Sequence, residues 1–263
     1  MALTGKSPAD TYKDLLEIDN SNSGVGAVVK AIKTGNGALT STSISDRALK
    51  VISNTDNGSA FSVTDSEGGV KLVVDTTNSQ VKALGNHINT QYASFGVSSN
   101  DSASFSANTH HPLPFTTMAI GSSSVQDNIT FGTSGEPATS FTTADAVTTD
   151  ASLIVPVMWY VPDNISIDGV TSLEGFELSS TLTTRMHLYS YTFTSGSTSA
   201  LTSGTLLAHN SDVTNAGSEQ AYLSTWTVDS ASVASGKVIL AFFRMDSSTD
   251  NPSVSITVKY HLT

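Results

Sequence analysis

The alternation of apolar and polar residues at the C-terminal end of the chain is typical of a β-strand. Every second residue from Val254 through Ile256, Val258 and Tyr260 to Leu262 is apolar. Because successive side chains of a strand point to opposite faces, this pattern predicts one face in a core and one face in solvent. The residues predicted to face solvent are Ser255, Thr257, Lys259 and His261.

Segments rich in β-branched and aromatic residues predict further strands before this one. They are residues 153–161, 165–170, 185–193, 222–228 and 236–244. No helical pattern separates these segments, so we expect an antiparallel β-sandwich, with a jelly roll as its form. Residues 97–152, dominated by Ser, Thr, Asn and Gly, predict long loops and short strands that belong to the same domain. We place this domain at residues 93–263.

A small three-stranded meander is predicted for residues 51–92. Residues 60–65 and 70–75 flank a Glu67-Gly68-Gly69 turn, and residues 80–84 follow a second turn at 76–79. Strands separated by glycine turns in this way predict hairpins. A sheet of this size buries little area by itself and gains most by stacking against copies in neighbouring chains. We therefore interpret it as a shaft or collar.

The first 50 residues predict a region for attachment and self-association that begins with a short helix. Ser7 suits the position that caps a helix, Pro8 suits its first turn, and a run of turn-forming residues ends it at 19–24. One apolar stripe on so short a helix needs a docking partner. The expected attachment and trimer-interface residues on that stripe are Tyr12, Leu15, Leu16 and Ile18. The pattern over residues 25–53 is ambiguous between helix and strand, and we interpret it as mostly β.

Composition and charge narrow the function. Only 13% of residues are charged and 77 are Ser or Thr, while 38% are hydrophobic, which is more than disordered chains carry. Residues 101–263 hold 14 acidic and 4 basic side chains, a balance that repels nucleic acid and anionic lipid. No apolar run reaches the length of about 18 residues that predicts a membrane helix. We therefore expect neither nucleic-acid binding nor membrane insertion.

Searches for catalytic or metal-binding motifs lead us to expect no enzyme, no cofactor and no metal site. The calcium-like pattern that starts at Asp19 has Lys30 where the last carboxylate is required, and the pattern at 54–58 fits a turn. His110 and His111 are adjacent, so a strand would point them to opposite faces; the alternative is that one of them lines the three-fold axis of a trimer and binds an ion there. His187, His209 and His261 stand isolated in the sequence. Glu174 and Glu177 would be the two acids if the chain were a polysaccharide hydrolase. The aromatic residues that would stack on sugars, if they are not buried, are Tyr92, Phe115, Trp159 and Tyr222.

Three parts of the chain resemble phage tail-fibre and virion fibre proteins of the marine-phage type. Residues 11–25 (TYKDLLEIDNSNSGV), with Gly35-Asn36-Gly37 and Ile44-Ser45-Asp46 after them, resemble the N-terminal region of such proteins. Residues 73–81 (VVDTTNSQV) are similar to the small β units of their shafts. Residues 141–145 (FTTAD), 159–163 (WYVPD) and 237–244 (KVILAFFR) resemble uncharacterised fibre-like proteins.

The resemblance implies a structural protein on the surface of a bacteriophage particle, made in the host cytoplasm. It would form a homotrimer, attach through its N-terminal region to another virion protein of the capsid, neck or tail, and display its C-terminal domain as a short fibre, spike or decoration. The alternative is a receptor-binding fibre whose loops recognise a host glycan or outer-membrane protein. A polysaccharide depolymerase is a third and weaker alternative.

Overall fold

The computed structural model is mainly β and divides into two units. It describes residues 16–18, 25–34, 37–53, 55–98, 105–115, 129–142, 154–177, 181–216, 219–247 and 251–263. The N-terminal unit is Met1–Ile88 and the C-terminal unit is Asn89–Thr263. The strand that starts at Thr90 therefore belongs to the C-terminal unit. None of the helices among the described residues is long and apolar enough to cross a membrane.

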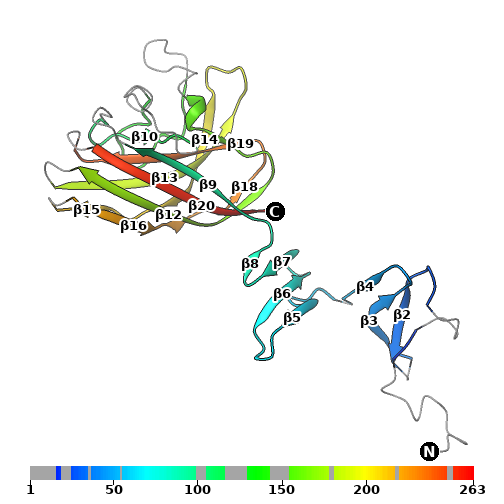
Figure 1. Cartoon of the computed structure of the whole chain (residues 1–263). Helices are drawn as coiled ribbons and strands as arrows, with labels where there is room; N and C mark the ends of the chain where they lie inside the picture. The colour runs from blue at the N-terminus through cyan, green and yellow to red at the C-terminus, as the bar shows by residue number, and fades with distance from the viewer. Residues whose placement is uncertain are drawn as a thin grey trace, which may run out of the picture. The chain divides into compact units, whose positions relative to one another are not determined.

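Two antiparallel four-stranded sheets make up the described part of the N-terminal unit (Figure 1). The first sheet consists of β1 (Leu16–Ile18), β2 (Lys30–Thr34), β3 (Leu39–Ile44) and β4 (Leu49–Val51). The second consists of β5 (Phe61–Thr64), β6 (Val70–Asp75), β7 (Gln80–Ala83) and β8 (Asn86–His87). In each sheet, strands that follow one another in sequence are hydrogen-bonded neighbours. Short turns permit this order because antiparallel neighbours need only a few connecting residues.

The predicted meander is confirmed, with one strand more than expected. Phe61 pairs with Val74 and Val74 pairs with Val81, so the first two predicted turns lie where the glycine and Asn-Ser patterns place them. Gly68 has φ of 85°, a conformation that disfavours residues with a Cβ. The strands predicted within residues 25–53 are also present as β2, β3 and β4.

The predicted N-terminal helix does not extend over residues 16–18. These residues form β1, in which Leu16 pairs with Thr34 and Ile18 pairs with Ile32 of β2. The edge of β2 offers backbone hydrogen bonds along a whole ladder, whereas a helical stripe of four apolar residues supplies little stabilisation alone. The earlier part of the expected helix lies outside the described residues.

The C-terminal unit contains two antiparallel sheets that share one apolar core, an arrangement consistent with a β-sandwich (Figure 1). The larger sheet has the order β10-β19-β13-β14-β17, with β11 on β19 and β15 on β13, and the smaller sheet has the order β16-β12-β20-β9, with β18 on β12. Strands of the larger sheet are β10 (His111–Pro112), β11 (Trp159–Tyr160), β13 (Leu182–Phe193), β14 (Leu201–His209), β15 (Val213–Asn215), β17 (Thr227–Val228) and β19 (Lys237–Met245). Strands of the smaller sheet are β9 (Thr90–Ser98), β12 (Ile165–Glu177), β16 (Ala221–Thr225), β18 (Ser232–Val233) and β20 (Asn251–Leu262).

Both faces of the larger sheet are covered. Its inner face packs against the smaller sheet through residues such as Leu188, Ala241 and Phe243. Its outer face carries Tyr191 and Phe242, which pack under residues 129–142 and 154–158 in a second core. Strands buried on both faces read as continuous apolar runs, which explains the unbroken run from residue 238 to 243. The outer face positions the candidate site described below.

Two sequence expectations for this unit are wrong in part. Residues 154–157 are helical, with a 3-10 turn η1 at Val155–Val157, and within the described residues 154–161 of the strand expected at 153–161 only Trp159–Tyr160 pairs as a strand. Pro156 has no N–H to donate to a sheet ladder, which favours a turn over a central strand. The strand β14 (Leu201–His209) was not expected, because its Thr, Ser and Gly residues weaken the apolar alternation.

Candidate functional site: a basic cluster on the larger sheet

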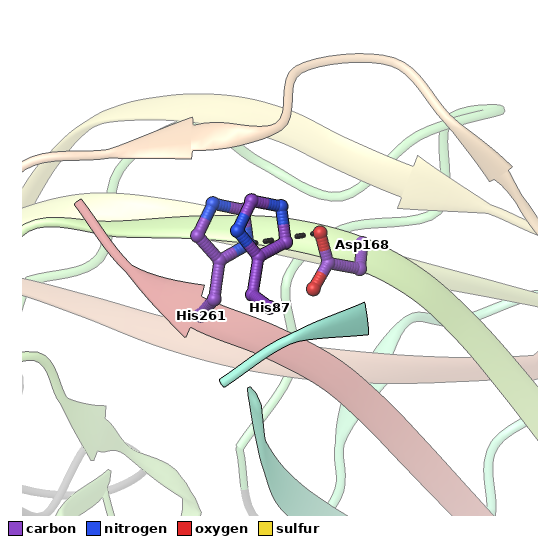
Figure 2. Close-up of side chains that lie close together, drawn as sticks. All are labelled: His87, Asp168 and His261. Atoms are coloured by element: carbon purple, nitrogen blue, oxygen red, sulfur yellow. Dashed lines mark hydrogen bonds and ion pairs between the residues drawn. The ribbon is translucent and has the colours of Figure 1, made fainter. Parts of the chain in front are cut away.

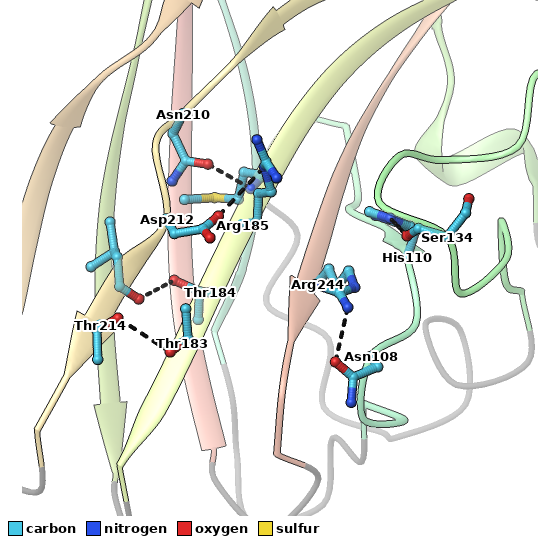
Figure 3. Close-up of polar contacts among 12 residues, drawn as sticks. Asn108, His110, Ser134, Thr183, Thr184, Arg185, Asn210, Asp212, Thr214 and Arg244 are labelled. Atoms are coloured by element: carbon cyan, nitrogen blue, oxygen red, sulfur yellow. Dashed lines mark hydrogen bonds and ion pairs between the residues drawn. The ribbon is translucent and has the colours of Figure 1, made fainter.

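Two arginines lie opposite each other on the outer face of the larger sheet. Arg185 of β13 and Arg244 of β19 are register partners. Residues an even number of positions apart on a strand share a face. Tyr189, four residues after Arg185, and Phe242, two residues before Arg244, both belong to the outer core, so the two arginines lie on the outer face. Arg185 is 3.5 Å through its Nε from Asp212 Oδ1, and Arg244 Nη2 donates to Asn108 Oδ1 at 2.9 Å (Figure 3). Both side chains are partly exposed.

Three histidines adjoin the arginine pair. His187 of β13 is 1% exposed, and its ring centroid is 5.2 Å from that of His110, which is fully buried. The backbone and ring of His110 bind the segment that covers the outer core: its Nε2–H donates to the Ser134 carbonyl at 3.0 Å (Figure 3). On the other side, His209 of β14 pairs with His187 and donates from Nδ1 to Asp229 Oδ2 at 2.7 Å. We call Arg185, Arg244, His110, His187 and His209 the basic cluster.

The two buried histidines are neutral at pH 7. Burial lowers the pKa of His110 to about 4, and the positive charges of Arg244 and Arg185 act in the same direction. Burial also lowers the pKa of His187 to about 3, assisted by His110 and Arg185. Desolvation disfavours the charged form of a histidine, and nearby cations disfavour it further. The arginines therefore carry the positive charge of the site, and the two imidazoles add polar but uncharged walls.

Buried polar atoms without hydrogen-bond partners concentrate at this cluster. Eight such side-chain atoms occur among the described residues, and five of them belong to the cluster or to its neighbour Asn210. These five are Arg185 Nε, Arg244 Nε, His110 Nδ1, His187 Nδ1 and Asn210 Nδ2. Asn210 is fully buried and already accepts the Met186 N–H at 2.7 Å through Oδ1. A buried polar atom without a partner is costly in a folded protein, so five of them in one place call for a physical explanation, such as a bound ion.

A separate histidine–aspartate pair, His261 of β20 and Asp168 of β12, lies on the smaller sheet (Figure 2). His261 Nδ1 donates to Asp168 Oδ1 at 2.9 Å. Asp168 lies between Ile167 and Gly169, where the register of β12 against β20 shifts. A bulge of this kind turns an extra side chain toward its neighbours. His261, expected to face solvent, is 8% exposed, so that expectation is wrong.

The expected attachment residues lie at the N-terminal edge of the described chain. Tyr12 and Leu15 fall outside the described residues, as do Asp19 and the first residue of the 54–58 pattern. Leu16 is 62% exposed in β1, while Ile18 is half-buried beside β2. Leu16 and Ile18 are therefore placed on a strand and not on a helical stripe.

The other sequence candidates are scattered. His110 and His111 point to opposite faces as expected, because His111 contacts Phe105 of the inner core. Both histidines are fully buried in the unit, so neither lines the axis of a trimer. Glu174 is 2% exposed, lies inside the sandwich and accepts a 2.7 Å hydrogen bond from Thr184 Oγ1. The side chain of Glu177 is outside the described part of the chain.

Of the four aromatic residues considered for sugar stacking, one is well exposed. Tyr92 is 66% exposed and Trp159 is 7% exposed, whereas Phe115 and Tyr222 are partly buried against the inner core. Trp159 stacks on Phe115 at 5.8 Å between ring centroids. The expectation that Trp159 is buried by its apolar neighbours is confirmed.

The basic cluster was missed from the sequence because its members are spread over residues 110–244. His187 and His209 were interpreted as isolated, and the structure corrects this, since antiparallel pairing of β13 and β14 brings them together. The one available signal was that two of the four basic residues in 101–263 are arginines at the ends of apolar strand patterns. No protein-family model and no curated protein matches the chain.

Proposed function

We propose that the chain is a structural protein of the bacteriophage surface, a trimeric short fibre, spike or decoration that attaches through its N-terminal unit and displays a jelly-roll-like sandwich. The observation that carries this proposal concerns the N-terminal unit. None of the described hydrophobic side chains from residue 16 to 88 is buried, although these residues form two sheets. An antiparallel sheet normally buries one face, so this unit is incomplete as a single chain.

The exposed apolar side chains of the N-terminal unit occur in both sheets. Leu39 is 61% exposed and Leu49 is 68% exposed in the first sheet, and Phe61 is 42% exposed in the second. Each large aliphatic side chain that becomes fully buried contributes about 1.5–3 kcal/mol. Covering several of them on each of three copies supplies enough free energy to hold an assembly together.

Association with copies of the same chain and with a virion protein accounts for this surface. Three copies bring identical apolar faces together around one axis, and the faces left over remain for a capsid, neck or tail protein. The N-terminal resemblance to fibre proteins supports the same arrangement. The strongly acidic C-terminal unit keeps neighbouring copies apart and favours an exposed position on the particle.

Light scattering during size-exclusion chromatography tests the trimer. A trimer of the 27.3 kDa chain has a mass of about 82 kDa. The double variant Leu39→Asp/Leu49→Asp should shift the mass toward the monomer, because charges in the proposed interface oppose its burial. Leu223→Asp is the matched control, since Leu223 is 73% exposed but belongs to the C-terminal unit. A wild-type monomer at micromolar concentrations would contradict the proposal.

Particle incorporation tests the location separately. Deletion of residues 1–50 should prevent incorporation into phage particles while leaving the C-terminal unit folded, because that unit has its own core. Immunogold labelling of intact particles measures both incorporation and position. Normal incorporation of the deleted chain would refute attachment through the N-terminal region.

A receptor-binding fibre is the second candidate, and the basic cluster favours it. A displayed protein that only fills or decorates a surface has no need for unpartnered polar atoms beside two exposed arginines. Under this alternative, purified residues 89–263 should block adsorption of the phage to its host. The structural proposal predicts no block.

A further inference from the structure

The pairing of Arg185 with Arg244 is unfavourable unless something neutralises it. Opposed residues on neighbouring antiparallel strands have Cα atoms about 4.5–5.5 Å apart, so like charges there destabilise the sheet. The described neighbours supply little compensation. Asp212 is 58% exposed and only 3.5 Å from Arg185, which makes it a weak surface pair, and Arg244 bonds to a neutral amide.

The charge of the unit makes the pairing more unusual. Residues 101–263 contain four basic side chains, and two of them face each other here among 14 acids. Two further acids in the described part of the chain already have partners: Asp229 accepts from His209, and Glu136 accepts from the Tyr189 hydroxyl at 2.7 Å. With only four cations in this region, the chain could carry them far apart. The placement of Arg185 opposite Arg244 therefore requires a physical explanation.

The unpartnered atoms around the arginines are suited to an anionic group. Among the described residues, Arg244 Nε has no hydrogen-bond acceptor, and the only acceptor near Arg185 Nε is the exposed Asp212 Oδ1 at 3.5 Å (Figure 3). A guanidinium presents its N–H groups as a planar fork that matches the two oxygens of a carboxylate, sulfate or phosphate. The nearby neutral imidazoles add no negative charge that would oppose an anion.

We propose that Arg185 and Arg244 bind one oxyanion of a ligand, such as the carboxylate, sulfate or phosphate group of an acidic glycan. The oxygens accept hydrogen bonds from both guanidinium groups, and the anion neutralises the opposed charges. The inference does not depend on trimer formation or on virion attachment, because all of these residues belong to the C-terminal unit.

Calorimetric titration of the full-length protein at pH 7 and low ionic strength tests the site. The probes are sodium sulfate, sodium phosphate, sodium acetate and sodium glucuronate. Sodium chloride is the control, because the chloride ion has no pair of oxygens to match the guanidinium fork. We expect saturable binding of at least one oxyanion in the millimolar range, and at least tenfold weaker binding of chloride. Comparison of sulfate and phosphate with the two carboxylates identifies the group that the site prefers.

Variants separate this site from general attraction to positive charge. Arg185→Gln and Arg244→Gln should each weaken oxyanion binding at least tenfold. Arg47→Gln, the matched control, removes the same charge from a side chain that is 83% exposed in the N-terminal unit and should bind as the wild type does. Absence of binding by all four oxyanions, or equal losses in all three variants, would overturn the proposal.

A second pair of variants covers the case in which the glutamine variants fail to fold. Arg185→Lys and Arg244→Lys keep the charge but replace the planar fork with a single ammonium group. We expect both to retain the wild-type circular dichroism spectrum and to bind oxyanions severalfold more weakly. Wild-type affinity in both lysine variants would show that the fork has no role, and the assignment would then be wrong.

Discussion

Lowering the pH from 7 to 5 should destabilise the C-terminal unit because two histidines are buried in their neutral form. The folded pKa values of His110 and His187 are about 4 and about 3, below the value of 6.5 in an unfolded chain. Between the folded pKa and the unfolded pKa, the unfolded chain binds protons at these two histidines and the folded chain does not. Stability is therefore fully present above pH 6.5 and is lost as the pH falls toward the folded values.

The size of this loss follows from the proton balance. At pH 5 both histidines are almost fully protonated in the unfolded chain and almost fully neutral in the folded one. Each difference of one proton over one pH unit changes the free energy of unfolding by about 1.4 kcal/mol. Integration from pH 7 to 5 gives a loss of about 2 kcal/mol for each histidine, or about 4 kcal/mol for the pair. That is a large fraction of the 5–15 kcal/mol that stabilises a typical domain.

Urea unfolding followed by tryptophan fluorescence measures the stability of the C-terminal unit, which contains the two histidines. Both tryptophans of the chain, Trp159 and Trp226, are buried in the core of the C-terminal unit. The free energy of unfolding is determined at pH 7, 6 and 5 for the wild type and for His187→Phe. We expect the variant to lose about 2 kcal/mol less than the wild type between pH 7 and 5.

Phe242→Leu is the control for destabilisation without titration. Phe242 lies in the same outer core, and its shortening should lower stability equally at all three pH values. The reasoning would be refuted if the wild type and His187→Phe lost the same free energy over this range. It would be weakened equally if Phe242→Leu reproduced the pH dependence of His187→Phe.

Two further predictions concern single residues of the C-terminal unit. Gly204→Ala should lower the free energy of unfolding by about 1–3 kcal/mol in urea titrations, because a Cβ would meet Tyr191 Cε1 at 2.6 Å and Thr139 Cα at 2.8 Å. The control Gly135→Ala, whose Cβ would have no atom within 4 Å, should change stability little. Equal effects of the two substitutions would disprove the steric reason. Burial raises the folded pKa of Glu174 above 4.5, so its ionisation opposes folding increasingly as the pH rises through that value. Glu174→Gln should therefore be more stable than the wild type at pH 8, with the gain disappearing toward pH 4 in the same assay, and a gain independent of pH would contradict this assignment.

Local patterns in the sequence were sufficient for much of the β architecture. The period of two in residues 254–262 correctly predicts that Val254, Ile256 and Val258 are buried. The glycine turn at 67–69 correctly predicts the pairing of β5 with β6. Both signals are local, because alternation and turn chemistry are determined by neighbours within a few residues.

The same local rules failed where a distant partner decided the outcome. Residues 16–18 joined the edge of β2, where Leu16 pairs with Thr34 and Ile18 pairs with Ile32. His261 follows the polar phase of its strand, yet the bulge at Asp168 supplies a carboxylate partner that allows it to be buried. In each case hydrogen bonds to another segment outweighed the preference of the residue itself.

The residues themselves determined that the chain is mainly β and that its C-terminal part is acidic. Only the tertiary structure placed Arg185 opposite Arg244 and gathered His110, His187 and His209 around them. The register of β13 between β14 and β19 is set by the packing of both faces of the larger sheet, and no pattern within one strand encodes it. The reason is physical: a cluster built from side chains over a hundred positions apart exists only when the strands that carry them are paired.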